Sequence, residues 1–143
     1  MTTPRDTVLH RWFEEVWNRR DARAIDEMFH PGVRIHGLID ARGDDVTGVE
    51  HFKRFHQESL AAFSDIHVVV EDTLSEGDKV AARCTTRARH TGEGLGISPT
   101  DKSLEYTGMY IVRLEGGKIV EAWNCIDLLA AFRQLGLISL PVK

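Results

Sequence analysis

The fold is decided by the stretch from Phe63 to Gly136, where strand-like runs follow one another with short turns between them. It reads F-S-D-I-H-V-V-V-E-D (63–72), E-G-D-K-V-A-A-R (76–83), R-H-T-G-E-G-L-G-I-S-P-T (89–100), V-R-L-E-G-G-K-I-V-E-A-W (112–123) and D-L-L-A-A-F-R-Q-L-G (127–136). From residue 66 onward, apolar residues alternate with polar ones, which is typical of half-buried strands. We predict strands at 66–70, 79–90, 104–114 and 118–125, with a glycine-rich loop over 91–101 and a closing helix from Asp127 to Gly136.

The residues before this stretch predict helices. Apolar residues at helical spacing favour a helix over 4–18 and a short one over 21–28 begun by Asp21. His30-Pro31-Gly32 indicates a stop, and a strand follows over 33–37. After a polar loop over 40–47, a capping box of Thr47 and Glu50 begins a helix that carries apolar side chains as far as Phe63. Helices followed by consecutive strands indicate the α+β class with an antiparallel sheet covered by the N-terminal helices.

Size and composition limit the classes of function. The chain has 143 residues, of which 42% are hydrophobic, and its net charge is −4. We expect one domain over residues 1–143, no nucleic-acid partner, and no membrane span, because apolar runs stay far below ~20 residues. The sequence M-T-T-P-R-D at the start does not resemble a signal peptide, so we expect a cytoplasmic protein. Cys84 and Cys125 are expected to be buried thiols.

Several familiar site patterns are absent from the sequence. Gly92, Gly94 and Gly96 precede a strand, whereas a phosphate-binding loop precedes a helix. His51 and His56 are five residues apart on one helix and point in different directions, so we expect no metal site. No serine lies in a G-x-S-x-G turn, so a catalytic triad is unsupported.

The pattern from Phe63 onward resembles the SnoaL-like polyketide cyclase family, whose cone-shaped α+β fold is shared with ketosteroid isomerases and nuclear transport factor 2-like proteins. The resemblance implies a cystatin-like fold, in which a curved antiparallel or mixed sheet wraps around N-terminal helices to form an internal pocket. It also implies that no cofactor is needed. Members of this family use an Asp before the last helix as the general acid/base, and Asp127, four residues after Trp123, matches it. His90 in R-H-T-G and His36 in I-H-G match further family positions.

Each candidate residue also has a simpler interpretation. Asp127 stands where a helix N-cap is favoured, and a carboxylate tied to backbone amides has a lowered pKa, which is wrong for an acid. His90 and His36 are acceptable as structural or exposed histidines. Tyr110 offers a hydroxyl to a developing enolate or merely packs. The remaining candidates, expected to form the pocket wall, are Trp12, Phe52, Met109 and Trp123.

Two hypotheses of function follow. The first is a cofactor-independent enzyme of the polyketide cyclase or isomerase type, which binds a small apolar carbonyl-bearing molecule and transfers protons through Asp127 and His90. The second is a non-catalytic small-ligand-binding or assembly domain of the same fold. The enzyme hypothesis requires Asp127 to face a closed apolar cavity. We also expect a homodimer, because the strand-rich half has apolar residues on both faces, including 68–70 and 111–112.

Overall fold

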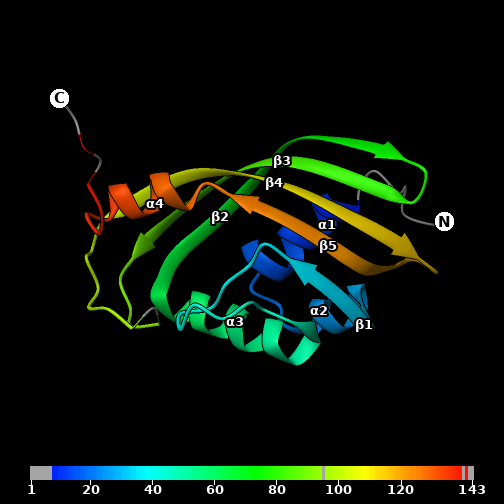
Figure 1. Cartoon of the computed structure of the whole chain (residues 1–143), viewed down its shortest axis with the longest axis horizontal. Coiled ribbons are helices and arrows are strands. Elements are labelled where there is room, and N and C mark those ends of the chain that lie inside the picture. The colour runs from blue at the N-terminus through cyan, green and yellow to red at the C-terminus, as the bar shows by residue number, and fades with distance from the viewer. Residues whose placement is uncertain (1–7, 95, 140, 142–143) are drawn as a thin grey trace.

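The computed structural model describes residues 8–94, 96–139 and 141. Four α-helices, one π-helix and five strands follow one another along this part of the chain (Figure 1). In chain order they are α1 (Val8–Trp12), η2 (Phe13–Asn18), α2 (Arg23–Met28), β1 (Phe29–His36), α3 (Gly48–Ala62), β2 (Phe63–Glu76), β3 (Lys79–His90), β4 (Ser103–Glu115), β5 (Lys118–Ile126) and α4 (Leu128–Gln134). Among the described residues, no helix is both long and apolar enough to cross a membrane.

The five strands form one mixed sheet in the order β1-β5-β4-β3-β2. Strand β1 pairs with β5 in parallel, whereas the other three pairings are antiparallel. Figure 1 shows the long strands arching over the N-terminal helices, with α3 facing the sheet from below and α4 at the opposite end from the chain's N-terminal helices. The expectation of an α+β fold with a curved sheet around N-terminal helices is therefore confirmed.

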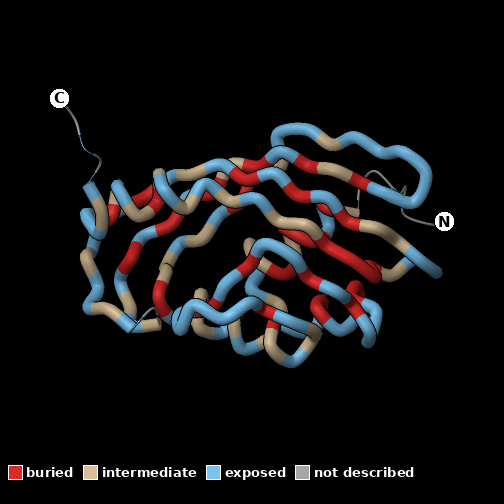
Figure 2. The backbone as a smooth tube through the Cα atoms, in the orientation of Figure 1, coloured by how far each residue is buried: buried red, intermediate tan, exposed pale blue. Residues whose placement is uncertain are grey.

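The core lies between the concave face of this sheet and the helices, where Figure 2 shows the buried segments. Strand β3 illustrates why, because every second residue from Val80 to His90 is buried and the intervening residues are exposed or half-buried. A strand presents alternate side chains to opposite faces, so this alternation assigns Val80, Ala82, Cys84, Thr86, Ala88 and His90 to the concave face. Cys84 is buried as expected, but Cys125 is exposed and faces the other side.

Some boundaries differ from those the sequence predicts. Strand β1 begins at Phe29, because the irregular pairing between Phe29 and Arg34 accommodates the Pro31-Gly32 pair. The last turns of the first helix form the π-helix η2, and position 4 lies outside the described residues. Helix α3 ends at Ala62, and Phe63 opens β2, which extends to Glu76 and is therefore longer at both ends than the strand predicted over 66–70.

The predicted capping box is also wrong in detail. Thr47 is the N-cap of α3 but its side chain makes no capping hydrogen bond. Instead, the backbone amide of Thr47 donates to Nδ1 of His51 at 3.1 Å, which replaces the expected role of Glu50. At the start of α2, the carboxylate of Asp21 accepts a hydrogen bond from the amide of Arg23 at 3.0 Å, although the N-cap position itself is Ala22.

Candidate functional site

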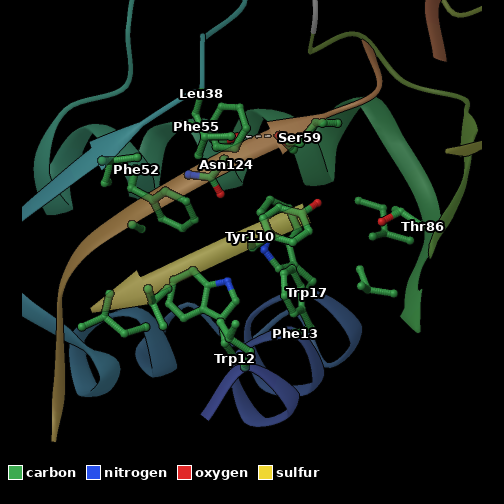
Figure 3. A pocket seen from close by; sticks show the side chains of 18 of the residues that line it. Trp12, Phe13, Trp17, Leu38, Phe52, Phe55, Ser59, Thr86, Tyr110 and Asn124 are labelled. Atoms are coloured by element: carbon green, nitrogen blue, oxygen red, sulfur yellow. Dashed lines mark hydrogen bonds between the residues drawn. The ribbon is translucent and has the colours of Figure 1, made fainter. Parts of the chain in front are cut away.

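A cavity of about 120 Å³ lies between the concave face of the sheet and helices α1, η2 and α3 (Figure 3). Its lining comprises Leu9, Trp12, Phe13, Trp17, Phe29, Ile35, Leu38, Phe52, Phe55, Ser59, Phe63, Ile66, Val68, Thr86, Ala88, Tyr106, Tyr110, Val112, Ile119, Ala122, Asn124 and Ile126. The lining is fully buried at Leu9 and Ile119, whereas Ser59, Asn124 and Ile126 are partly exposed. The cavity is therefore closed at one end and reaches solvent at the other.

The π-helix η2 supplies part of the aromatic lining. Its wide turns place Phe13 and Trp17 on the cavity side, one turn apart, and Trp12 lies just before it. Such turns are rare and are frequently found at functional sites. Two polar contacts hold this segment in place. The side-chain amide of Asn18 donates to the carbonyl of Val68 at 3.0 Å and accepts from its amide at 2.7 Å.

The second contact joins η2 to helix α3. His56 is buried and its Nε2 donates to the carbonyl oxygen of Val16 at 2.7 Å. Burial lowers the pKa of His56, which keeps the ring neutral. The π-helix is thus fixed to α3 on one side and to β2 on the other, so its aromatic side chains are held rigidly against the cavity.

The expected wall residues Trp12 and Phe52 do line the cavity. Trp12 stacks on Phe29 with ring centroids 4.6 Å apart and tilts against Phe52 at 5.4 Å. The rings of Trp17 and Phe52 are nearly perpendicular, with their centroids 6.3 Å apart. Offset and edge-to-face pairs of this kind stabilise an aromatic wall beyond its burial of apolar area.

The cavity has few polar groups, and no described residue that lines it is Asp, Glu, His, Lys, Arg or Cys. Its polar side chains are Ser59, Thr86, Tyr106, Tyr110 and Asn124. The hydroxyl of Ser59 is engaged, because it donates to the carbonyl of Phe55 at 2.8 Å. The phenol of Tyr106 lies beside the hydroxyl of Thr86. The phenol of Tyr110 and the amide oxygen of Asn124 have no hydrogen-bond partner among the described residues, so both are open to a ligand, as are the indole N–H groups of Trp12 and Trp17.

Burial sets the protonation state of the tyrosines. It raises the pKa of Tyr110 far above its ordinary value, and the neighbouring Tyr106 adds to the shift. Burial likewise raises the pKa of Tyr106, although its hydrogen bond to Thr86 acts in the opposite direction. Both phenols stay protonated at any physiological pH and act as hydrogen-bond donors.

Leu38 reaches the cavity from the loop between β1 and α3, which is organised around Asp40. The Asp40 carboxylate accepts hydrogen bonds from the amides of Arg42 and Asp44, at 2.9 and 3.0 Å, and from Nε2 of His51 at 2.9 Å. These bonds, with that from His51 the strongest cause, hold the pKa of Asp40 well below its usual range. Asp40 thereby keeps the loop folded and Leu38 in place.

Asp127 does not face this cavity. Its side chain is exposed and accepts a hydrogen bond from the amide of Ala130 at 3.0 Å, as the N-cap of α4. Of its two expected roles the structure supports the cap, whereas the position lacks the apolar cavity that a general acid/base at Asp127 requires.

His90 also lies outside the lining, although it is fully buried. Its ring lies against Phe63, with centroids 5.4 Å apart, and Nδ1 accepts the amide of Thr100 at 3.2 Å. Nδ1 therefore carries no proton, which leaves the proton on Nε2. Nε2 has no hydrogen-bond partner among the described residues, and Phe63 separates the ring from the cavity.

Three other expected site residues lie on the outside of the sheet. His36 donates to the carboxylate of Glu121 at 2.8 Å and stacks on Trp123 at 5.5 Å. Met109 is 62% exposed. The side chain of Ile111 lies on the outer face of the sheet, and Trp123 is its cross-strand partner. His36 pairs with Trp123 and Met109 is two residues from Ile111, so all three expected residues lie on this outer face and cannot form the cavity wall.

Sequence reasoning overlooked Trp17, Thr86, Tyr106 and Asn124. One signal could have found two of them. Thr86 and Asn124 are polar residues at positions that share strand parity with buried apolar neighbours, namely Ala88 and Ala122. A polar side chain on the apolar face of a strand is a candidate for ligand contact. Within the part of the chain that the structure describes, no three His, Cys, Asp or Glu side chains are grouped as metal ligands.

Comparison with known proteins agrees with this architecture. The family model described as SnoaL-like polyketide cyclase matches residues 7–135. Among solved structures, AclR, a proposed hydroxylase from Streptomyces galilaeus, is 26% identical with a TM-score of 0.82, and the match covers 97% of this chain and 89% of AclR. IdmH, a proposed polyketide cyclase from Streptomyces antibioticus, is 29% identical with a TM-score of 0.79, covering 94% and 99%. No curated protein matches the chain.

Proposed function

The chain belongs to the SnoaL-like polyketide cyclase family, and we propose that its cavity binds the reacting end of an uncharged, carbonyl-bearing molecule and activates it for enolisation or ring closure. The observation that carries this proposal is a cavity whose described lining has no charged side chain and in which the Tyr110 phenol has no hydrogen-bond partner among the described residues. An apolar cavity with a few placed polar groups is the usual form of a small-molecule site.

The size of the cavity indicates what part of the ligand it encloses. A dry cavity of ~150 Å³ binds benzene in an engineered protein. The present cavity, at about 120 Å³, encloses about one ring, and the rest of a larger ligand would extend through the end near Ser59 and Ile126.

Tyr110 would act by hydrogen bonding to the carbonyl oxygen of the ligand. When the C–H bond beside that carbonyl breaks, its electron pair forms the C=C bond of an enolate and negative charge moves onto the oxygen. A neutral donor in apolar surroundings stabilises that charge more strongly than water does. The proton leaves to water, because no described lining residue is a base. The enolate carbon then either regains a proton from water or attacks a second carbonyl, which closes a ring. In the second case the π electrons of that carbonyl move to its oxygen, and the alkoxide that forms takes a proton back from water.

The second candidate function is ligand binding without catalysis, and the same lack of an acid or base in the lining favours it. The two differ in whether the bound molecule reacts. We would incubate the protein with 2-indanone in deuterated buffer, follow loss of the α-proton signals by nuclear magnetic resonance, and measure binding in parallel through the fluorescence of Trp12 and Trp17. Exchange faster than in buffer supports catalysis. Binding without faster exchange supports the binding domain.

A further inference from the structure

Tyr110 and Asn124 are direct cross-strand partners on β4 and β5, and both line the cavity. Partners in an antiparallel pair have Cβ atoms roughly 5 Å apart. The side chains of Tyr110 and Asn124 therefore leave the backbone side by side, on the sheet face that lines the cavity.

The amide of Asn124 has a defined orientation. Its Nδ2 donates to the carbonyl oxygen of His36 at 2.9 Å. A carbonyl oxygen can only accept, so the nitrogen of the amide must face His36 and Oδ1 must face away from it. In Figure 3 the oxygen of Asn124 is directed into the space between Phe52 and Tyr110. Asn124 thus offers the cavity an acceptor and not a donor.

The hydroxyl of Tyr110 lies some distance from that acceptor. A side chain at Gly108 would overlap the Tyr110 hydroxyl, so the phenol lies along β4 above Gly108, two residues before Tyr110. Two residues along a strand span roughly 7 Å. The Tyr110 hydroxyl near Gly108 and the Asn124 amide opposite Tyr110 are therefore set apart along the strand direction, so a ring lying over both can reach each of them with a different end.

We propose that the ligand is a ring-sized hydroxy-carbonyl compound, whose carbonyl oxygen accepts from Tyr110 and whose hydroxyl, at the opposite end of the ring, donates to Oδ1 of Asn124. This ligand assignment rests on the proposed function, since it assumes that the cavity is the binding site. It adds a requirement for a donor on the ligand, because a ligand that covers the amide oxygen of Asn124 without donating to it shuts out water and leaves that oxygen unpaired. Sites built to bind a hydroxyl reject analogues that lack it for this reason.

Four related aromatic probes test the assignment. Binding of 4-hydroxyacetophenone, acetophenone, 4-methoxyacetophenone and 4-ethylphenol is measured by tryptophan fluorescence and titration calorimetry, at slightly acidic pH where the phenols stay neutral. We expect 4-hydroxyacetophenone to bind roughly five- to tenfold more tightly than each of the others, the typical net effect of one neutral hydrogen bond.

Two variants test whether Asn124 causes the tighter binding of 4-hydroxyacetophenone. Asn124→Leu removes the acceptor at similar volume and should reduce the preference for 4-hydroxyacetophenone over acetophenone to nearly onefold. Gln57→Leu is the control, because Gln57 is an exposed residue of α3 that does not line the cavity, and this variant's preference should equal that of the wild-type chain. Circular dichroism checks that each variant is folded.

The results distinguish a failure of the ligand assignment from a failure of the proposed function. Equal binding of the hydroxyl and methoxy probes to the wild-type chain overturns the ligand assignment and leaves the proposed function intact, and this comparison decides even where Asn124→Leu does not fold. A preference that persists in folded Asn124→Leu also overturns it. Failure of all four probes to bind overturns the proposed function itself.

Discussion

The ring of Phe13 lies against the ring of Tyr110, with centroids 4.9 Å apart and planes inclined by 58°. Phe13 belongs to the π-helix and Tyr110 to β4, so this contact joins the helical layer to the sheet at the cavity. With Gly108 beneath the phenol, the Tyr110 ring is held on two sides by apolar atoms. Its position does not depend on the hydroxyl, which makes Tyr110→Phe a clean chemical probe.

Tyr110→Phe should lower the rate of α-proton exchange in 2-indanone on the order of 10²-fold, as expected for one lost oxyanion donor. The melting temperature should stay close to that of the wild-type chain, because the Tyr110 hydroxyl makes no hydrogen bond among the described residues. Nuclear magnetic resonance gives the rate and circular dichroism the melting temperature. Tyr106→Phe is the comparison, with a smaller loss expected because the Tyr106 phenol has the Thr86 hydroxyl beside it. An unchanged rate in Tyr110→Phe would contradict its role.

Filling the cavity should block binding without unfolding the protein. Ala122 lines the cavity, so the larger side chain of Ala122→Leu enters existing space and should abolish binding of 2-indanone at little cost in stability. Ala82 is equally buried but does not line the cavity, and Ala82→Leu should destabilise the chain by about 1–3 kcal/mol through overpacking. Urea denaturation and fluorescence titration measure both effects. Undiminished binding by Ala122→Leu would place the ligand elsewhere.

The carboxylate of Asp40 should stabilise the loop that carries Leu38, and through this loop it should affect both ligand binding and the pH dependence of stability. Asp40→Ala removes the acceptor of four hydrogen bonds and should lower the melting temperature and weaken binding, since Leu38 lies in the same loop. Because the pKa of Asp40 is lowered by folding, its stabilising effect is complete above the ordinary value of about 3.9 and disappears as pH falls through the lower folded value.

Thermal unfolding of the wild-type chain and of Asp40→Ala, measured between neutral and acidic pH, tests this dependence. The difference in melting temperature should be constant near neutrality and shrink only in strong acid. A difference that vanishes already near neutral pH would show that another group is responsible.

Local patterns made the sheet predictable. The alternation in β3 and the Gly116-Gly117 turn define strands whose bounds the structure reproduces within one or two residues. By contrast, Phe29 begins a strand through pairing with Ile119, ninety residues away in sequence, and the π-helix depends on contacts from His56 and Val68. Long-range pairings of this kind leave no local signal.

The site was harder to predict because residue type says little about which face a side chain occupies. Asp127 matches the family position of a general acid/base, yet its place before α4 makes it a cap. Asn124, three residues earlier and unremarkable in type, faces the cavity because it shares the parity of Ala122. Tyr110 is among the residues expected in the pocket, and the structure places it there.

The outward face of the sheet leads us to propose a homodimer. Leu74, Ala81, Ile111 and Trp123 are successive cross-strand partners on this face, and Leu74 is 76% exposed. An exposed apolar row across four strands favours an interface. Sedimentation velocity should give a dimer for the wild-type chain and a monomer for Ile111→Lys. Ile39→Lys, at an exposed loop position, should remain dimeric. A monomeric wild-type chain would refute the proposal.

Asn124→Asp tests whether the cavity lacks only a base. The substitution adds a carboxyl group among apolar side chains, where desolvation raises its pKa toward the working range of a general base. It retains an acceptor but loses the hydrogen bond to His36, so some loss of stability is expected. A positioned base typically contributes 10²–10⁴-fold, and we expect exchange in 2-indanone to rise by about 10²-fold, with a rate that increases with pH as the carboxyl ionises. Binding without any gain in rate would mean that the ligand's C–H bond does not lie beside Asn124.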